Sequence, residues 1–194
     1  MFWIEAVAAL LGVLSVILMA RQQPLAWPVG LAMVLLYIAV FQNARLYSEM
    51  LLQMVYAVLQ LYGWWCWRRG TPARAVLAVS TLAWPRAARD LLAGLLVTVA
   101  LGWLMSRYTN AQQPWLDAAL TGFSLVGQYW MAHKRLQCWP LWLVVDCVYV
   151  GMFLAVGLRL TALLYLVFTA LAIYGWRQWH LAERTAQRAA AVAA

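Results

Sequence analysis

The sequence predicts an all-α membrane protein with seven transmembrane helices, in which a three-helix unit occurs twice. Two observations predict this fold class, and the first is composition. Hydrophobic residues make up 66% of the 194 residues and charged residues only 10%, whereas a soluble domain carries about a quarter charged residues. A chain of this length cannot bury so much apolar surface in a water-soluble core, so the apolar segments are expected to cross a membrane.

The second observation is an internal repeat, which aligns residues 27–67 with residues 139–179 without a gap at a constant offset of 112. Fourteen of the 41 aligned positions are identical, including the run Tyr62-Gly63-Trp64 with Tyr174-Gly175-Trp176. The offset covers four predicted helices, and an even number of crossings returns the chain to the same side. The two halves are therefore expected to be parallel, and repeats of this kind are typical of secondary transporters.

Seven apolar segments give the helices in order, each close to the length that crosses about 30 Å of hydrocarbon. They cover residues 2–20, 24–43, 46–67, 87–106, 114–133, 138–157 and 160–180. The first segment lacks a basic region and a small-residue cleavage site, which favours a retained span over a signal peptide. The six prolines fall in loops or near helix starts, where a missing N–H costs no helical hydrogen bond.

The repeat divides these helices in a 3+1+3 pattern. A first three-helix repeat covers residues 1–67, and a cytoplasmic loop with a linker helix covers 68–111. The second three-helix repeat covers 112–180, and a cytoplasmic tail covers 181–194. The tail is expected either to extend the last helix or to fray.

Basic residues are distributed unevenly between the two sides of the predicted bundle. Eleven Lys and Arg residues fall on one side, and three, Arg45, Arg107 and Arg159, fall on the other. The positive-inside rule then places the N-terminus outside and the C-terminus in the cytoplasm. The net charge of +8 is therefore interpreted as a topology signal, which argues against nucleic-acid binding.

Several spans carry polar or aromatic side chains on one face, at spacings of three, four and seven residues. Such groups are costly in hydrocarbon unless they face protein or a wet cavity. The stripes comprise Gln53, Tyr56, Gln60 and Trp64 on the third span, Asp117, Thr121, Ser124 and Gln128 on the fifth, Trp142, Asp146, Tyr149 and Phe153 on the sixth, and Thr161, Tyr165, Thr169 and Trp176 on the seventh. Gln side chains of this kind also tie helices together in membrane bundles, so both roles stay open.

Asp146 is the only charged residue between Leu136 and Leu158. Its equivalent in the first repeat is Val34, so the carboxylate is specific to the second half. It either bonds a neighbouring helix or lines a substrate path, and intramembrane acids favour the second role. Aromatic faces and one carboxylate attract a cation, while Gln and Asn bond hydroxyls. The expected guest is a small, flat, cationic or polar heterocycle that carries hydroxyls.

The runs that include Trp27-Pro28, Leu51-Leu52-Gln53, Gln128-Tyr129-Trp130 and Gly175-Trp176-Arg177 resemble the PnuC family of bacterial vitamin transporters. The resemblance extends from Ile4 to Trp179 and implies a fold similar to the SWEET sugar transporters. It further implies a homotrimer that carries nicotinamide riboside, or in related branches thiamine or riboflavin, by facilitated diffusion, with a cytoplasmic kinase that traps the substrate. The implied central site corresponds here to Asn43, Gln53, Tyr56, Gln60, Gln128, Asp146, Tyr149 and Tyr165.

Trp64, Trp142 and Trp176 are candidate aromatic lining, although Trp64 and Trp176 also fit an interfacial belt. The resemblance favours an inner-membrane uniporter for nicotinamide riboside, with thiamine as the alternative and neutral riboflavin third. An intramembrane enzyme is disfavoured, because the spans lack paired carboxylates or a Ser/His pair and so offer no catalytic residues. A purely structural protein is disfavoured by the repeat. The three cysteines and two histidines form no ligand cluster, so neither a metal nor a cofactor is expected.

Overall fold

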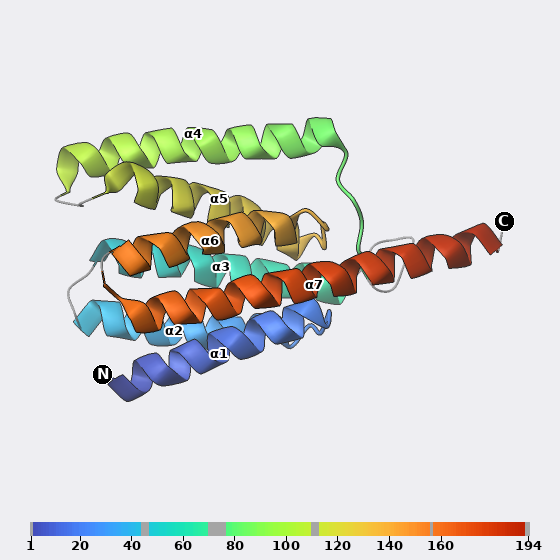
Figure 1. Ribbon diagram of the computed structural model, residues 1–194, viewed down its shortest axis with the longest axis horizontal. Coiled ribbons are helices and arrows are strands. Elements are labelled where there is room, and N and C mark those ends of the chain that lie inside the picture. Colours follow the sequence, from blue (N-terminus) through green and yellow to red (C-terminus); the bar gives the residue numbers. More distant parts are fainter. Residues whose placement is uncertain (1, 44–46, 70–76, 110–112, 156, 193–194) are drawn as a thin grey trace.

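Seven helices run side by side in the computed structural model, which describes residues 2–43, 47–69, 77–109, 113–155 and 157–192 (Figure 1). The side chains of residues 2, 47–49 and 190 are not described. The helices are α1 (Phe2–Ala20), α2 (Ala26–Asn43), α3 (Tyr47–Arg69), α4 (Trp84–Tyr108), α5 (Pro114–Ala132), α6 (Cys138–Ala155) and α7 (Arg159–Val192). The prediction of an all-α protein with seven helices is confirmed.

The largest difference from the expected boundaries is at the end of α7, which continues to Val192 instead of ending near residue 180. Figure 1 shows the C-terminal part of α7 projecting beyond the bundle. Residues 181–192 are Ala, Leu, Arg, Gln and Glu apart from one Thr and one Val, and they include neither Gly nor Pro, so their helix propensity is high. Residues 181–192 therefore extend the last helix, which is the first of the two expectations for the tail.

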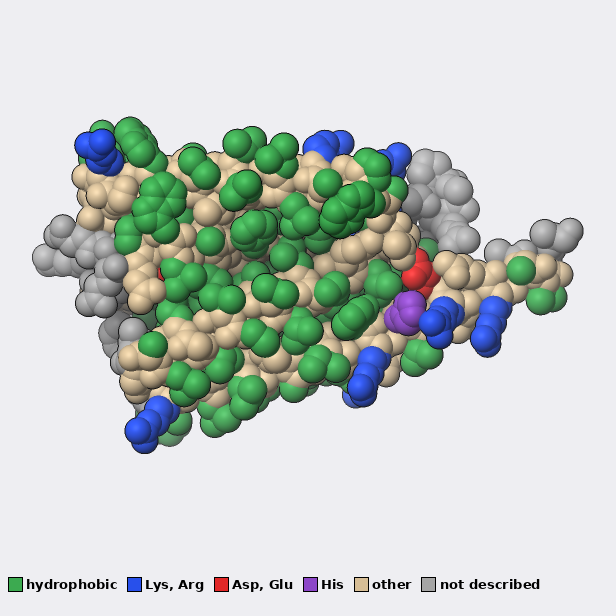
Figure 2. Space-filling model, turned by 45° about the horizontal axis from the view of Figure 1, so that its top comes forward, with side chains coloured by type: hydrophobic (Ala, Val, Ile, Leu, Met, Phe, Trp, Pro, Cys, Tyr) green, Lys and Arg blue, Asp and Glu red, His purple; other side chains and the backbone are tan. Residues whose placement is uncertain are grey.

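Five of the described helices, α1, α2, α4, α6 and α7, are long and apolar enough to cross a membrane. The other two, α3 and α5, carry the densest polar stripes predicted from the sequence, with Gln53 and Gln60 on α3 and Ser124 and Gln128 on α5. Figure 2 shows a face of the bundle dominated by hydrophobic side chains, with basic side chains towards its ends. This distribution fits a bundle surrounded by lipid.

Contacts between the two halves of the chain recur at the 112-residue offset of the sequence repeat. Helix α1 packs against α7, and α3 packs against α5. The indole Nε1 of Trp67 donates a hydrogen bond to the Met131 carbonyl at 3.2 Å. The equivalent indole of Trp179 donates to the Met19 carbonyl at 3.1 Å. The two hydrogen bonds between the halves are therefore equivalent under the repeat.

Two glycines of the repeat allow these tryptophans to pack closely. Gly63 lies against the ring of Trp27, and its equivalent Gly175 lies against the ring of Trp139, so closely that a Cβ at either position would overlap the indole. The Trp27 and Trp139 rings in turn meet Trp67 and Trp179 edge-on, at centroid distances of 5.5 and 5.3 Å. Trp67 and Trp179 lie 6.0 Å apart. The four buried indoles thus form one continuous cluster that joins the two halves.

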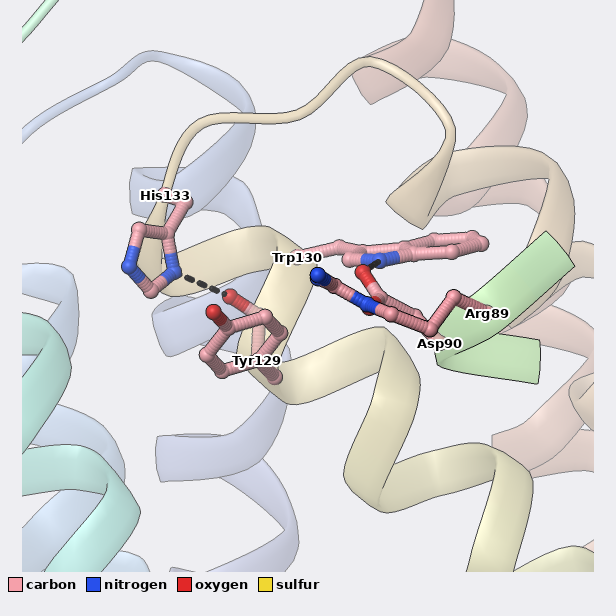
Figure 3. A network of polar contacts seen from close by, with 5 residues as sticks. All are labelled: Arg89, Asp90, Tyr129, Trp130 and His133. Atoms are coloured by element: carbon pink, nitrogen blue, oxygen red, sulfur yellow. Dashed lines mark hydrogen bonds and ion pairs between the residues drawn. The ribbon is translucent and has the colours of Figure 1, made fainter. Parts of the chain in front are cut away.

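Helix α4 lies at the edge of the bundle, where in the described residues it packs against α5 alone (Figure 1). Figure 3 shows the contacts at the end where α4 begins and α5 finishes. Trp130 Nε1 donates to Asp90 Oδ2 at 2.9 Å, and Arg89 pairs with the same carboxylate at 2.9 Å. His133 Nδ1 lies 2.9 Å from the Tyr129 carbonyl, and its Nε2 lies 3.1 Å from the Tyr62 hydroxyl. These contacts fix α4 to α5 and the end of α5 to α3.

Residues 77–83 follow an extended path across the same end of the bundle. Ser80 forms an isolated parallel bridge with Arg135 in the turn between α5 and α6. The Gln137 amide bonds both the N–H and the carbonyl of Leu82, at 3.0 and 2.9 Å. Thr81 Oγ1 donates to Glu183 Oε1 at 2.8 Å. The segment therefore connects the α5–α6 turn with the projecting part of α7.

Candidate functional site

A cavity of about 480 Å³ lies in the centre of the bundle and is lined by every helix except α4. Its wall combines apolar, aromatic and polar side chains. The lining residues are Ala9, Gly12, Ser15, Val16 and Met19 of α1; Met33, Val34, Tyr37 and Phe41 of α2; Leu52, Gln53, Tyr56 and Gln60 of α3; Ser124, Gln128 and Met131 of α5; Trp139, Trp142, Asp146, Tyr149 and Phe153 of α6; and Thr161, Leu164, Tyr165, Phe168 and Ala172 of α7.

Most of the residues that the sequence predicts for the site line this one cavity. They are Gln53, Tyr56, Gln60, Gln128, Asp146, Tyr149, Tyr165 and Trp142. Asn43 is exposed at the end of α2 and does not line the cavity. Trp64 packs beside the tryptophan cluster with the Arg68 guanidinium 5.3 Å from its ring, and Trp176 is 42% exposed. Both tryptophans lie outside the cavity lining.

Asp146 supplies the one carboxylate in the cavity wall, and its residue is only 5% exposed. Within the described part of the chain, no hydrogen bond or ion pair from a protein group reaches it. A buried carboxylate without a partner is strongly destabilising. The geometry therefore leaves Asp146 available to a cation or hydrogen-bond donor that enters the cavity.

Two further polar groups in the wall lack a protein partner among the described residues. They are the Gln60 side-chain oxygen and the Trp139 indole N–H, both fully buried. The hydroxyl of Ser15, in contrast, is already engaged, because it donates to the Ala26 carbonyl at 2.9 Å. Buried polar groups are normally satisfied by protein, water or ligand. Two residues of the cavity wall thus each keep one buried polar atom without a protein partner among the described residues.

Aromatic rings form a connected surface at one part of the cavity. Tyr149 stacks on Phe153 with centroids 5.8 Å apart, and Tyr165 lies 4.5 Å from Tyr149 and 5.2 Å from Phe153. In the first repeat, Tyr37 and Phe41 occupy the equivalent positions and stack at 5.8 Å. Ring faces of this kind attract planar and cationic groups. The arrangement can bind a flat heterocycle, and it provides no nucleophile–base pair for a covalent reaction.

Several residues that line the cavity were not predicted from the sequence. Ser15, Tyr37, Phe41 and Trp139 are the informative ones. Tyr37 and Phe41 could have been found by applying the repeat to Tyr149 and Phe153, since each pair is identical at the 112-residue offset. Ser15 precedes the aligned repeat and has no polar neighbour on its own helix face, so nothing in the sequence singled it out.

A family profile described as "Nicotinamide mononucleotide transporter" matches residues 2–181, which is nearly the whole chain. The chain belongs to this family. Its members include PnuC of Escherichia coli, a nicotinamide riboside transporter that is 27% identical over 206 residues, covering 91% of this chain and 84% of that protein. The riboflavin/roseoflavin transporter RibM of Streptomyces davaonensis is 30% identical over 189 residues, covering 96% of this chain and 88% of RibM.

The fold of the family is also shared. A crystal structure of the vitamin B3 transporter PnuC matches with a TM-score of 0.75 at 25% identity, covering 94% of this chain and 83% of that one. The resemblance inferred from the sequence motifs is therefore confirmed. The chain is a membrane-spanning vitamin transporter of the PnuC family, and it is not an enzyme.

Proposed function

We propose that this PnuC-family transporter carries nicotinamide riboside through the central cavity. The observation that carries the proposal is Asp146, a buried carboxylate that faces the cavity without a protein partner in the described residues. Nicotinamide riboside has a permanently charged ring, which a carboxylate stabilises in a low-dielectric site. The nearby rings of Tyr149 and Tyr165 offer faces for the same cation. The similarity to nicotinamide riboside transporters of Escherichia coli and Neisseria mucosa supports this choice.

Riboflavin is the second candidate, and the similarity to RibM supports it. Its isoalloxazine ring is neutral and larger, and the cavity of about 480 Å³ has mostly apolar and aromatic walls. A neutral guest would still need a donor for Asp146, which an imide N–H can supply. Thiamine, the alternative from the sequence, shares the permanent ring cation, and none of the relatives named above is described as carrying it.

We further propose that transport is facilitated diffusion through a homotrimer in the bacterial inner membrane. The N-terminus lies outside and the C-terminus lies in the cytoplasm, as the eleven-to-three basic bias indicates. A cytoplasmic kinase then traps the vitamin as its phosphate. The support for uniport is that Asp146 is the one ionisable carboxylate among the cavity-lining residues, so a chain of titratable groups for proton coupling is missing there.

Calorimetry of the purified transporter with nicotinamide riboside, thiamine and riboflavin tests the substrate directly. We expect saturable binding of nicotinamide riboside and weaker binding of both riboflavin and thiamine. Nicotinamide, which has the ring without the permanent charge, serves as the matched control and should bind far more weakly than the riboside. Tight riboflavin binding with no response to the riboside would replace the first candidate by the second.

A further inference from the structure

Residues 77–83, which we call the strap, follow the first half in the sequence but are bonded to the second half, whose last helix is α7. The Ser80 N–H donates to the Lys134 carbonyl, and the Ser80 carbonyl accepts from the Leu136 N–H, both at 3.1 Å. Further hydrogen bonds join the strap to Arg135, Gln137 and Glu183. All of these partners lie in the α5–α6 turn or on the projecting part of α7 (Figure 1). The strap therefore clamps this turn and α7 into one body.

Lys134 extends from this clamped turn to the first half. Its Nζ donates to Gln22 Oε1 in the α1–α2 turn at 3.3 Å, and it lies 4.5 Å from the centroid of the Trp67 ring on α3. The residue is almost fully buried, so little water competes for its ammonium group. Because the strap fixes the backbone of Lys134 and the first half holds its side chain, this one residue connects the two bodies.

The cavity is closed at the end of the bundle that holds Lys134. Met131 and Trp139 line the cavity at that end, and they are only 4% and 1% exposed. At the opposite end, Phe41 and Phe153 also line the cavity and are only partly buried. A vitamin that leaves the cavity past Lys134 therefore requires the two halves to separate there.

We propose that Lys134 is the latch of this end. The strap, the α5–α6 turn and α7 move as one body, and the release of Lys134 from Gln22 and Trp67 opens the path. Transporters built from repeats expose their site by moving one repeat against the other, so the contacts that break lie between the two bodies and not within one. The inference rests on the proposed function, which makes this end the cytoplasmic side on which the vitamin leaves.

Native Cys138 can report the opening without any vitamin. It is 0% exposed and belongs to the buried cluster in which the two halves meet. In a protein in which Cys66 and Cys147 are replaced by Ala, the rate at which N-ethylmaleimide alkylates Cys138 measures how often this end opens. The variants are Gln22→Ala and Gln22→Glu. Gln23→Ala is the matched control, because Gln23 is an exposed residue of the same type in the same turn.

Gln22→Ala should raise the alkylation rate about tenfold, because a hydrogen bond to a charged group is lost. Gln22→Glu should lower the rate about twofold to fivefold, because its carboxylate pairs with the Lys134 ammonium group. Gln23→Ala should be alkylated at the wild-type rate. Circular dichroism of the same samples establishes that each variant is folded during the assay. Equal rates for both Gln22 variants and the control would overturn the latch.

A reversible crosslink tests the division into two bodies. One protein carries Gln22→Cys with Lys134→Cys, another carries Thr81→Cys with Glu183→Cys, and both lack the three native cysteines. A short bis-methanethiosulfonate joins each pair. The first crosslink spans the two bodies and should abolish nicotinamide riboside uptake into liposomes until a reductant removes it. The second lies within one body and should leave uptake unchanged.

Uptake that continues through the first crosslink, or that is blocked by the second, would overturn the division into two bodies. Cys138 alkylation decides the role of the latch even if the Lys134→Cys protein does not fold, because Gln22 is a half-buried turn residue. A wild-type protein that carries no vitamin would instead refute the proposed function, and alkylation would still test the latch. The two failures are therefore distinguishable.

Discussion

Lys134 Nζ donates a hydrogen bond to Gln22 Oε1 at 3.3 Å, and the two residues stand at equivalent places 112 positions apart. Both have a left-handed backbone, with φ of 49° and 57°, in the turns that follow α5 and α1. Lys134 is 3% exposed, and its Nζ lies 4.5 Å from the centroid of the Trp67 ring. The turns of the two halves are thus joined directly at the end of the bundle that holds the tryptophan cluster.

The stability of the transporter should depend on the protonation of Lys134. Burial lowers the pKa of this amine from 10.5 to about 8. Between these two values the unfolded chain binds more protons than the folded one, so stability rises with pH across that window. The melting temperature of the wild type should therefore increase relative to that of Lys134→Met as the pH rises from about 8 towards 10.5. If the melting temperatures of the two proteins changed with pH by the same amount, Lys134 would not titrate in this way.

Replacement of the cavity carboxylate should separate binding from stability. Asp146→Asn keeps the shape and can still form hydrogen bonds, so the fold should remain intact. The loss of one charge-assisted contact should weaken nicotinamide riboside binding by about tenfold to a hundredfold, equivalent to about 1.5–3 kcal/mol. Calorimetry and thermal unfolding are measured on the same preparation. A lower melting temperature with normal affinity would instead assign Asp146 a structural role.

The two glycines beneath the tryptophan cluster should be equally sensitive to substitution. Gly63→Ala and Gly175→Ala each place a Cβ inside the ring of Trp27 or Trp139, and overpacking of this kind costs about 1–3 kcal/mol. Both variants should lower the melting temperature by similar amounts. Gly151→Ala introduces the same methyl group into open space and controls for the change of residue type. Melting temperatures equal to that control would mean that the cluster relaxes freely.

A topology reporter fused after Ala194 tests the orientation of the termini. Eleven of the fourteen basic residues lie on the side of the C-terminus, so a reporter active only in the cytoplasm should give the signal. Fusion of the same reporter before Met1 is the paired control and should be silent. Activity of a periplasmic reporter at the C-terminal position would reverse the proposed orientation.

Transport in liposomes should reach equilibrium without accumulation. The cavity lining provides a single carboxylate and neither a second carboxylate nor a histidine, so an imposed proton gradient has no acidic relay to act on. The measurement follows internal labelled nicotinamide riboside with and without pH and sodium gradients, and empty liposomes are the control. Internal concentrations above the external one, dependent on either gradient, would exclude facilitated diffusion.

The repeat and the apolar segments were sufficient to predict the fold, because both depend on residue spacing alone. The candidate site residues were predicted less accurately, because some of them do not line the cavity. Periodicity places Trp64 on the same face of α3 as Gln53. The two residues are eleven positions apart, however, which corresponds to about 16 Å along the helix, and Trp64 does not line the cavity. Trp176 stands in the same relation to Tyr165. Periodicity thus predicts on which face of a helix a residue lies, but not whether it lies at the level of the cavity along the helix axis.

Asn43 illustrates the complementary limitation. It is two residues beyond Phe41, which lines the cavity, and two residues rotate a helical position by about 200° to the opposite face. The close packing of the Gln60 amide against Gly30 was equally hidden in the sequence. A glycine gives no indication of which side chain will fill the space it leaves, because that depends on the neighbouring helix.

The polar character of α3 and α5 has a consequence for how the protein is made. Among the described helices these two are not apolar enough to count as spans by themselves, because they supply Gln53, Gln60, Ser124 and Gln128 to the cavity. Segments with fewer apolar residues partition less favourably from the translocon into lipid, and contact with an apolar helix already in the membrane favours their insertion. Helix α3 packs on α2, and α5 packs on α4, so each has an apolar neighbour already synthesised when it emerges. We therefore expect α3 and α5 to enter the membrane together with the helices that precede them, and the polar residues that line the cavity to be the reason for this pairing.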